Sequence, residues 1–490
     1  MPRQKRALDA LWGVGVYGNV FFVKKTSPPS WKCHIAAASA LVFGAAALGD
    51  QISTNSPADP AAPVTGGPAA ALETPAAAGF QNWNWHAQNT DIVQGYPAFP
   101  AQYTGVNSLP SGGQTRETVS LDLMAGVRLW RGAEAHVDGL MWQGFGLHGG
   151  AGADGFPNGE GSRLGTDLPN ENFSRLFLRQ TIGFGGEQED VADDALDLAG
   201  REDVSRLTIT AGRFSAKDIF DNNSYANDPR TQFMNWALEA NEAWDYPADA
   251  LGYTSGLALE LNQPQWTFRY GFFQVPQTAN NTYIDYHFLE AWGMVTELER
   301  RFTIGGHPGA VRLLGYFNRA HMGSYQEAVN NFNQGGSIDI TQTRSYRSKY
   351  GFGLNAEQEI ATNVGVFTRL GWSDGQNEAW MFSDVDYSAS LGVSVKGAAW
   401  HRPDDTFGLA GAMNGLSHSH QEFFEDGGVG ILAGDGNLNY SPEKVLETYY
   451  DLDVWKTVHV AVDYQFVADP AFNQDRGPVS VFSARLHWEF

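Results

Sequence analysis

The last segment of the chain, residues 479–490, alternates apolar and polar side chains with a period of two. One parity carries Phe482, Ala484, Leu486, Trp488 and Phe490, and the other carries Ser483, Arg485, His487 and Glu489. This period places the two sets on opposite faces of a β-strand. An ordinary edge strand of a soluble protein would leave two large aromatic side chains in water, which such proteins avoid. We therefore expect an amphipathic strand with one face in lipid.

The same alternation recurs along the chain and predicts an all-β fold of about sixteen strands, with a margin of two. Residues 457–467 place Val458, Val460, Val462, Tyr464 and Phe466 opposite His459, Asp463 and Gln465. Charged groups on the polar face of one strand after another are typical of a wet barrel lumen. The predicted strands are 82–93, 117–130, 133–145, 173–185, 204–214, 253–262, 265–275, 290–302, 310–321, 349–360, 363–373, 384–397, 405–416, 443–454, 457–467 and 479–490.

Short and long connections alternate between these strands. The short ones include 131–132, 263–264, 361–362 and 455–456, and the long ones include 215–252 and 322–348. Short turns on one side and long loops on the other are the signature of an outer-membrane barrel. An even strand number leaves both termini on the short-turn, periplasmic side. The acidic segment 186–203 stands where a short turn is expected, and we interpret it as an elaborated periplasmic turn.

The N-terminal part predicts export. Residues 35–48 form a short Ala-rich apolar run, preceded by Lys24, Lys25 and Lys32 and followed by small residues around Gly49. A basic, apolar and small-residue order is that of a secretory signal, although a buried helix is the alternative. We predict a signal peptide with an unusual extension at 1–49, a flexible Ala/Pro-rich leader at 50–79 and a single barrel domain at 80–490. Residues 1–23 are either a longer basic region or the product of a misplaced start codon.

Composition narrows the class further. The 490 residues include 56 glycines and 13% aromatic residues, the mean hydropathy is −0.32, and no apolar run reaches the length of a membrane helix. The net charge is 32 − 55 = −23, which argues against nucleic-acid binding. The one cysteine, Cys33, lies before the predicted processing site, which fits an exported chain without disulfides.

Several segments resemble the carbohydrate-selective porin family of the OprB type. They are 85–95 (WHAQNTDIVQG), 212–222 (GRFSAKDIFDN), 403–410 (PDDTFGLA), and the C-terminal region from 446–450 (LETYY) through 475–478 (DRGP) to Phe490. The resemblance implies a monomeric sixteen-stranded barrel that admits glucose-like sugars by diffusion. It also implies that the outer-membrane assembly machinery recognises the last strand and its terminal Phe490. The N-terminal extension and the acidic segment depart from the family pattern.

Parity predicts which charged groups face the lumen. A sugar constriction needs hydrogen-bonding groups that replace part of the solute's hydration. A structural network that stiffens the wall would use the same groups, and the sequence leaves both roles open. The candidates in strands are Arg128, Glu134, Arg175, Arg179, Arg269, Glu297, Glu357, Arg369 and Arg485, with Asp122, His136, Asp138, Glu299 and Glu359 on the same parity.

The longest loop, 215–252, supplies two further candidates. Asp228 before Pro229 predicts a helix start, and Phe233, Trp236, Ala237 and Ala240 follow at helical spacing. Such a loop either folds into the lumen, with Arg230 and Trp236 at the rim of the pore, or packs as an extracellular cap.

Motifs for other chemistry are weak. His418 and His420 lack further metal ligands, and the stretch that begins at Asp435 lacks the turn glycine and the final glutamate of a calcium loop. There is no phosphate-binding loop and no dinucleotide fingerprint. We therefore expect neither a cofactor, nor a metal, nor a catalytic site.

The leading hypothesis is a sugar porin in the outer membrane of a Gram-negative-type bacterium, with lipid and lipopolysaccharide around it. A general or anion-preferring diffusion porin is the first alternative. A structural anchor or a barrel enzyme is the second. The strand histidines His136, His459 and His487 lie on the lumen parity, whereas a lipid-hydrolysing barrel would place its histidine on the outer wall.

Overall fold

A computed structural model describes residues 80–161 and 165–490 of the chain. The predicted signal peptide and leader, together with Cys33, lie outside these residues. Among the described helices, none is both long and apolar enough to cross a membrane.

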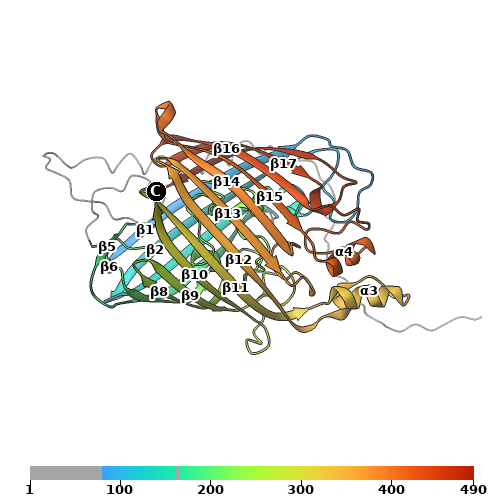
Figure 1. The fold of residues 1–490 in the computed structure, drawn as a ribbon, viewed down its shortest axis with the longest axis horizontal. Coiled ribbons are helices and arrows are strands. Elements are labelled where there is room, and N and C mark those ends of the chain that lie inside the picture. The colour runs from blue at the N-terminus through green and yellow to red at the C-terminus, as the bar shows by residue number, and fades with distance from the viewer. Residues whose placement is uncertain (1–79, 162–164) are drawn as a thin grey trace, which may run out of the picture. The chain divides into compact units, whose positions relative to one another are not determined.

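Sixteen antiparallel strands close into a barrel in which neighbours in space are neighbours along the chain (Figure 1). Closure is made by β1 (Trp83–Tyr96), which pairs with both β2 (Gln114–Trp130) and β18 (Val479–Glu489). The other strands are β3 (Ala133–Gly144), β4 (Thr166–Gly183), β7 (Arg206–Phe214), β8 (Thr254–Gln263), β9 (Trp266–Phe273), β10 (Trp292–Ile304), β11 (His307–Met322), β12 (Ser345–Ala361), β13 (Val364–Ser373), β14 (Tyr387–Gly397), β15 (Arg402–Gly415), β16 (Glu443–Trp455) and β17 (Val458–Ala468). All sixteen predicted strands are confirmed.

The two faces of each strand follow the predicted parity. In β18, Phe482 and Leu486 are exposed on the outer wall, whereas Ser483, Arg485 and His487 are buried on the inner side. In β4, Leu176, Leu178 and Ile182 are exposed in the same way. The outer wall is therefore apolar and the inner wall polar, which is the arrangement required of a barrel in a bilayer.

The residues of the turns explain why the connections at one end of the barrel are short. Gly305 and Gly306 join β10 to β11 and have φ of 62° and 89°, and Ile304 pairs with His307. A two-residue hairpin with positive φ at both positions favours glycine, because a Cβ would be strained there.

The long loops lie at the other end and carry short helices. They include α3 (Tyr325–Asn333) and α4 (His418–Glu425), capped by Ser324 and Ser417 (Figure 1). His420 is buried in α4, where it pairs with Asp386 at 2.9 Å and stacks on Tyr325. No group of three or more His, Cys, Asp or Glu that could hold a metal occurs in the part of the chain that the structure describes.

The acidic segment between β4 and β7 forms a small hairpin of its own. Strand β5 (Gln188–Val191) pairs with β6 (Gly200–Asp203) outside the barrel sheet. In Figure 1 this hairpin lies at the end of the barrel that carries the C-terminus, the short-turn end. It is thus an elaborated turn at the short-turn end of the barrel.

Candidate functional site: the barrel lumen and its inward loop

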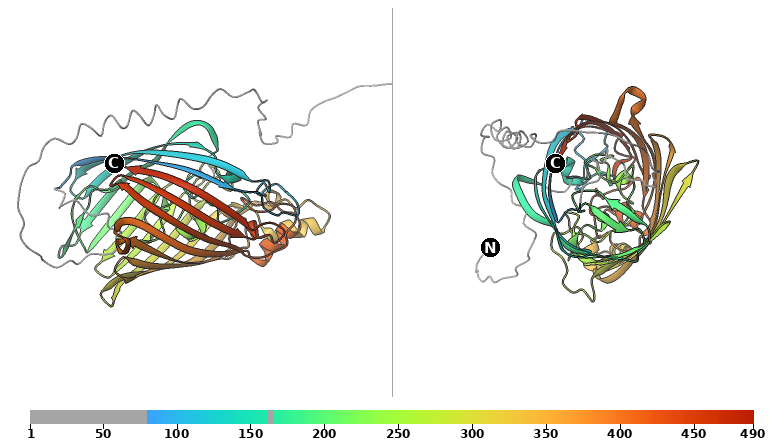
Figure 2. Two further views of the ribbon diagram at one scale, coloured as in Figure 1. Left: turned by 90° about the horizontal axis from the view of Figure 1, so that it is seen from above. Right: turned by 90° about the vertical axis from the view of Figure 1, so that its left-hand side faces the viewer.

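The lumen is occupied by the longest loop, residues 215–253, which connects β7 to β8. The end-on view of Figure 2 shows segments of chain inside the ring of strands. The loop contains a 3-10 turn at Ala216–Asp218 and one α-helical turn, α2 (Trp236–Glu239), in which the Asn235 side chain accepts a hydrogen bond from the Ala237 amide. Of the two predicted arrangements of this loop, the structure therefore has the one inside the barrel.

The predicted helix start at Asp228 is wrong. Asp228 instead caps a turn, accepting a hydrogen bond from the Arg230 amide at 2.9 Å, and the helix begins only at Trp236. Arg485 of β18 donates to the carbonyls of Pro229 and Gln232 at 2.7 and 2.8 Å. These carbonyl groups are bound by the wall, so the segment between them is held as a turn rather than as a helix.

The first latch between loop and wall is centred on Asp221. Arg369 of β13 forms an ion pair with its carboxylate at 3.1 Å and also donates to the Leu238 carbonyl at 2.8 Å. Asn355 of β12 donates to the Asp221 carboxylate at 2.8 Å, and the Asp221 amide donates to Glu297 of β10 at 2.8 Å. Arg369 is 1% exposed. It therefore ties two parts of the loop together and to the wall.

The second latch uses Glu447 of β16. Its two carboxylate oxygens accept the amide protons of Met234 and Asn235 at 2.6 and 2.9 Å. The Asn235 side chain donates in turn to Gln465 of β17 at 2.9 Å. The loop is thus fixed to β10, β12 and β13 by the first latch, and to β16, β17 and β18 by the second latch and Arg485.

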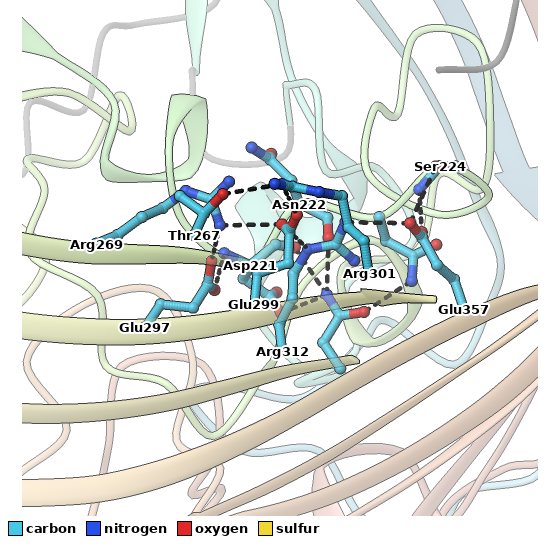
Figure 3. Close-up of polar contacts among 12 residues, drawn as sticks. Asp221, Asn222, Ser224, Thr267, Arg269, Glu297, Glu299, Arg301, Arg312 and Glu357 are labelled. Carbon is cyan, nitrogen blue, oxygen red and sulfur yellow. Dashed lines mark hydrogen bonds and ion pairs between the residues drawn. The ribbon is translucent and has the colours of Figure 1, made fainter. Parts of the chain in front are cut away.

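A ladder of alternating charges runs along the wall from β8 to β12 (Figure 3). Arg269 lies 3.1 Å from Glu260, 2.7 Å from Glu297 and 3.1 Å from Glu299. Arg312 continues the ladder from Glu299 at 2.9 Å to Glu357 at 3.1 Å. The far end returns to the loop, because Glu357 accepts the Ser224 amide at 2.6 Å. Every arginine in this ladder has a carboxylate on each side.

Arg175 on β4 and Arg230 on the loop are held by carboxylates in the same manner. Arg175 of β4 lies 2.7 Å from both Asp138 and Asp218, so it joins β3 to the start of the loop. Arg230 reaches from the loop to Glu160 at 3.1 Å and to Asp122 of β2 at 3.6 Å.

Trp236 lies in a packed aromatic cluster inside the lumen. Its ring stacks on Phe156 at 5.1 Å between centroids and lies 5.0 Å from Phe382 and 5.9 Å from Tyr246. Trp236 is buried, as are Phe156 and Tyr246. The cluster gathers three different loops and gives loop 215–253 an apolar core of its own.

The carboxyl group of Glu239, at the end of α2, is buried beside Lys217, whose Nζ lies 3.8 Å away. Burial raises the pKa of this carboxyl group to about 8, against a smaller opposing effect of Lys217.

All eleven predicted residues lie in or around the lumen, but they fall into different groups. Arg369, Arg485, Glu297 and Glu357 are almost fully buried and hold the loop. Arg269, Arg230 and Arg175 keep a small exposed fraction of their side chains, and Trp236 is part of the aromatic cluster. Arg128 and Arg179 contact the segment between β5 and β6, with Glu134 beside Arg128 at 2.8 Å.

Sequence reasoning missed Arg312, Asp221, Asn355 and Glu447. Arg312 is on the inward parity of β11 and could have been found by the rule used for the other strands. Asp221 is a loop residue whose partners Asn355 and Arg369 are 134 and 148 positions away, so no local pattern marks it.

A closed sixteen-stranded barrel with an apolar outer wall and a loop latched across a charged lumen defines an outer-membrane porin, a channel fold. The family model described as "Carbohydrate-selective porin, OprB family" matches residues 106–490, so the chain belongs to that family of sugar porins of the Gram-negative outer membrane. Among solved structures, the high-pH structure of Pseudomonas putida OprB superposes with a TM-score of 0.63 at 18% identity, covering 84% of this chain and 94% of that one.

Two more distant structural matches share the same coverage of this chain. The low-pH structure of the Pseudomonas putida protein has a TM-score of 0.45 at 14% identity and is covered to 93%. The outer-membrane channel DcaP of Acinetobacter baumannii has a TM-score of 0.44 at 9% identity and is covered completely. No curated protein sequence matches the chain.

Proposed function

We propose that this porin lets small glucose-like sugars diffuse into the periplasm through the barrel lumen, past loop 215–253 and the charge ladder of β8–β12. The observation that carries the proposal is the double latching of the loop inside the barrel of a carbohydrate-porin family member. A loop fixed at both Asp221 and Glu447 narrows the lumen permanently, and a passive pore needs no further chemistry.

Burial separates seven of the eleven predicted residues into two groups with different proposed roles. Arg369, Arg485, Glu297 and Glu357 position the loop. The side chains of Arg269, Arg230 and Arg175 retain a small accessible fraction beside carboxylates, and such groups can replace water around sugar hydroxyls. Because each arginine is flanked by acids, its hydrogen-bonding geometry is fixed before a solute arrives.

The same charge balance argues against an anion-preferring porin. Such a pore needs an unneutralised ring of Arg or Lys. Here Arg269 has three carboxylate partners, and Arg175 and Arg312 have two each. A sugar has no net charge, so a ladder of paired charges suits it better than it suits an anion.

The remaining partners follow from the outer wall and the C-terminus. Outward Leu, Phe and Trp side chains suit contact with membrane lipid and lipopolysaccharide. Phe490 is exposed beside Trp85 at 5.2 Å and, in the unpaired last strand before closure, is available to the assembly machinery. We propose a monomer, since the loop constricts one barrel by itself.

Vesicle swelling with purified protein tests this function. Entry of glucose would be compared with that of a disaccharide and of an amino acid of glucose's size, and single-channel currents recorded in parallel. Faster entry of glucose than of the amino acid, with a small current, is the expected result. Discrimination by size alone, with a large current, would make the protein a general porin. Absence of permeation would contradict the pore function and favour the alternative of a structural anchor or a barrel enzyme.

A latch variant tests the constriction. Arg369→Met leaves the buried Asp221 carboxylate without its cation, a loss of about 3–5 kcal/mol for a buried pair, which is enough to release the loop locally. We expect conductance to rise and the glucose-over-disaccharide preference to fall. Arg116→Met, at an exposed arginine bonded only to the neighbouring Thr115 carbonyl, is the control and should leave both unchanged.

A further inference from the structure

Residues 192–199, here called the periplasmic strap, connect β5 to β6. Val191 and Gly200 pair directly at the base of the strap, so a two-residue turn would be enough to close this hairpin. The strap instead has eight residues and its own tight turn, in which the amides of Asp194 and Asp197 donate to each other's carbonyls at 3.1 and 3.2 Å. The strap is therefore longer than is needed to connect β5 to β6.

The strap is anchored on the inner side of β1. Asn84, which is buried, donates to the Asp193 carboxylate at 2.8 Å and to the carbonyls of Asp194 and Asp197 at 3.1 and 2.9 Å. Gln81 exchanges backbone and side-chain hydrogen bonds with Ala199 and donates to Asp193 at 2.9 Å. These contacts join residues more than 100 positions apart.

Two lumen arginines hold the strap from β2 and β4. Arg128 donates to the carbonyls of Leu198 and Ala199, both at 3.1 Å. Arg179 donates to the Leu196 carbonyl at 2.9 Å and pairs with Asp197 at 2.5 Å. Since Asn84, Arg128 and Arg179 all point into the barrel near its short-turn end, the strap lies inside the periplasmic mouth.

The apolar side chains of the strap confirm this placement. Leu198 and Ala199 are 1% and 0% exposed, although they belong to a turn that lies beyond the membrane-spanning strands. Leu196 packs against the lumenal cluster that includes Phe177 and Phe214. A turn that only joined two strands would leave such residues in water.

The strap also brings an excess of negative charge to this mouth. Asp193, Asp194 and Asp197 join Glu134 and Glu202, whereas the nearby cations are Arg128, Arg179 and Arg206. Burial, followed by the closeness of Asp197 and Glu489, raises the pKa of Asp194, as expected where several carboxyl groups lie close together.

We propose that the strap is a second selectivity element of the pore. It limits the size of a solute leaving through the periplasmic mouth, and its carboxylates hold back anionic solutes such as uronates relative to neutral sugars. This inference rests on the proposed function, because it assumes that solutes pass through the lumen.

Replacing residues 192–199 by Asn-Gly tests the size limit, since this turn suits the Val191–Gly200 pair. We expect at least a twofold rise in single-channel conductance and faster disaccharide entry relative to glucose. The folded state of the variant is checked by the heat-dependent gel mobility of the barrel.

A second pair of variants tests the charge effect without removing the strap. D194N/D197N removes two carboxylates inside the mouth, and E187Q/D190N removes two on the exposed part of the hairpin. In a potassium chloride gradient, only the first should shift the reversal potential toward chloride, and only the first should speed glucuronate entry relative to glucose.

Unchanged conductance, size preference and reversal potential in the strapless and D194N/D197N proteins would overturn the inference. An equal shift in E187Q/D190N would also overturn it, because the effect would then come from overall charge. If the strapless chain fails to fold, the charge pair decides alone. Failure of the proposed function is distinguishable, because it appears in the wild-type comparison of glucose with the amino acid.

Discussion

At the scale of single residues, arginines that face the lumen from neighbouring parts of the wall bind different partners. Arg269 forms ion pairs with three carboxylates of the neighbouring strands, whereas Arg369 binds Asp221 and the Leu238 carbonyl of the loop. Both were predicted from parity alone, and parity reports only that a side chain points inward. Which inward arginine meets solute and which holds the loop depends on contacts across the barrel.

Glu239 permits a prediction about pH. Its folded-state pKa of about 8 lies above the ordinary value of 4.5, so the folded loop binds more protons than the released loop between these values. The stability of the packed loop is therefore greatest below pH 4.5 and falls as pH rises to 8, by at most about 1.4 kcal/mol per pH unit. Hydrogen exchange of the α2 amides at pH 5 to 9 should show faster opening at the higher values.

Glu239→Gln should remove this pH dependence, because the amide keeps the shape of the protonated acid. The neighbouring charged groups, Lys217, Asp228, Glu160 and Arg369, remain in this variant. Glu290→Gln, at an exposed carboxyl group, is the matched control and should behave like the wild type. A slope that persists in the Glu239 variant would assign the effect to another group.

At the scale of elements, strands were predictable and loops were not. Strand β18 was identified from alternation, because a wall between lipid and water imposes that period on every strand. The helix expected at Asp228 failed, because Arg485 binds the carbonyls that would have continued it. The acidic turn was recognised as unusual, but its insertion into the mouth depends on Asn84, which is distant in sequence.

The depth of a strand position in the membrane gives a second prediction. Leu391 in the middle of β14 and Ile304 at the periplasmic end of β10 both face outward and are 65% and 63% exposed. Leu391→Arg should cost about 2–4 kcal/mol in unfolding free energy in lipid, and Ile304→Arg about 0–1 kcal/mol. Denaturant unfolding in vesicles measures both. Equal costs would show that the two side chains do not lie at different depths.

At the scale of the whole molecule, closure couples the two ends of the described chain. Register pairs Gln88 to Gly95 of β1 with Glu489 to Phe482 of β18, and Phe490 and Ala87 exchange backbone hydrogen bonds at 2.8 and 3.0 Å. Every other strand pair joins consecutive elements of the barrel. The seam is therefore the one contact that local hairpins cannot nucleate, and it completes the lumen that the loop and strap then narrow.

A disulfide across the seam tests this register. Val93 and Ala484 are direct partners and both face outward, so their Cα atoms are within the range that a disulfide spans. Val93→Cys with Ala484→Cys, and Cys33→Ser, should oxidise readily and stabilise the barrel by about 2–5 kcal/mol, because the cross-link closes nearly the whole described chain into a ring. The control pairs Val93→Cys with Leu486→Cys, two residues out of register, and should stay reduced. Oxidation of the control instead of the matched pair would mean that the seam closes two residues away from this register, because a slip of two residues, unlike a slip of one, keeps both side chains on the outer face.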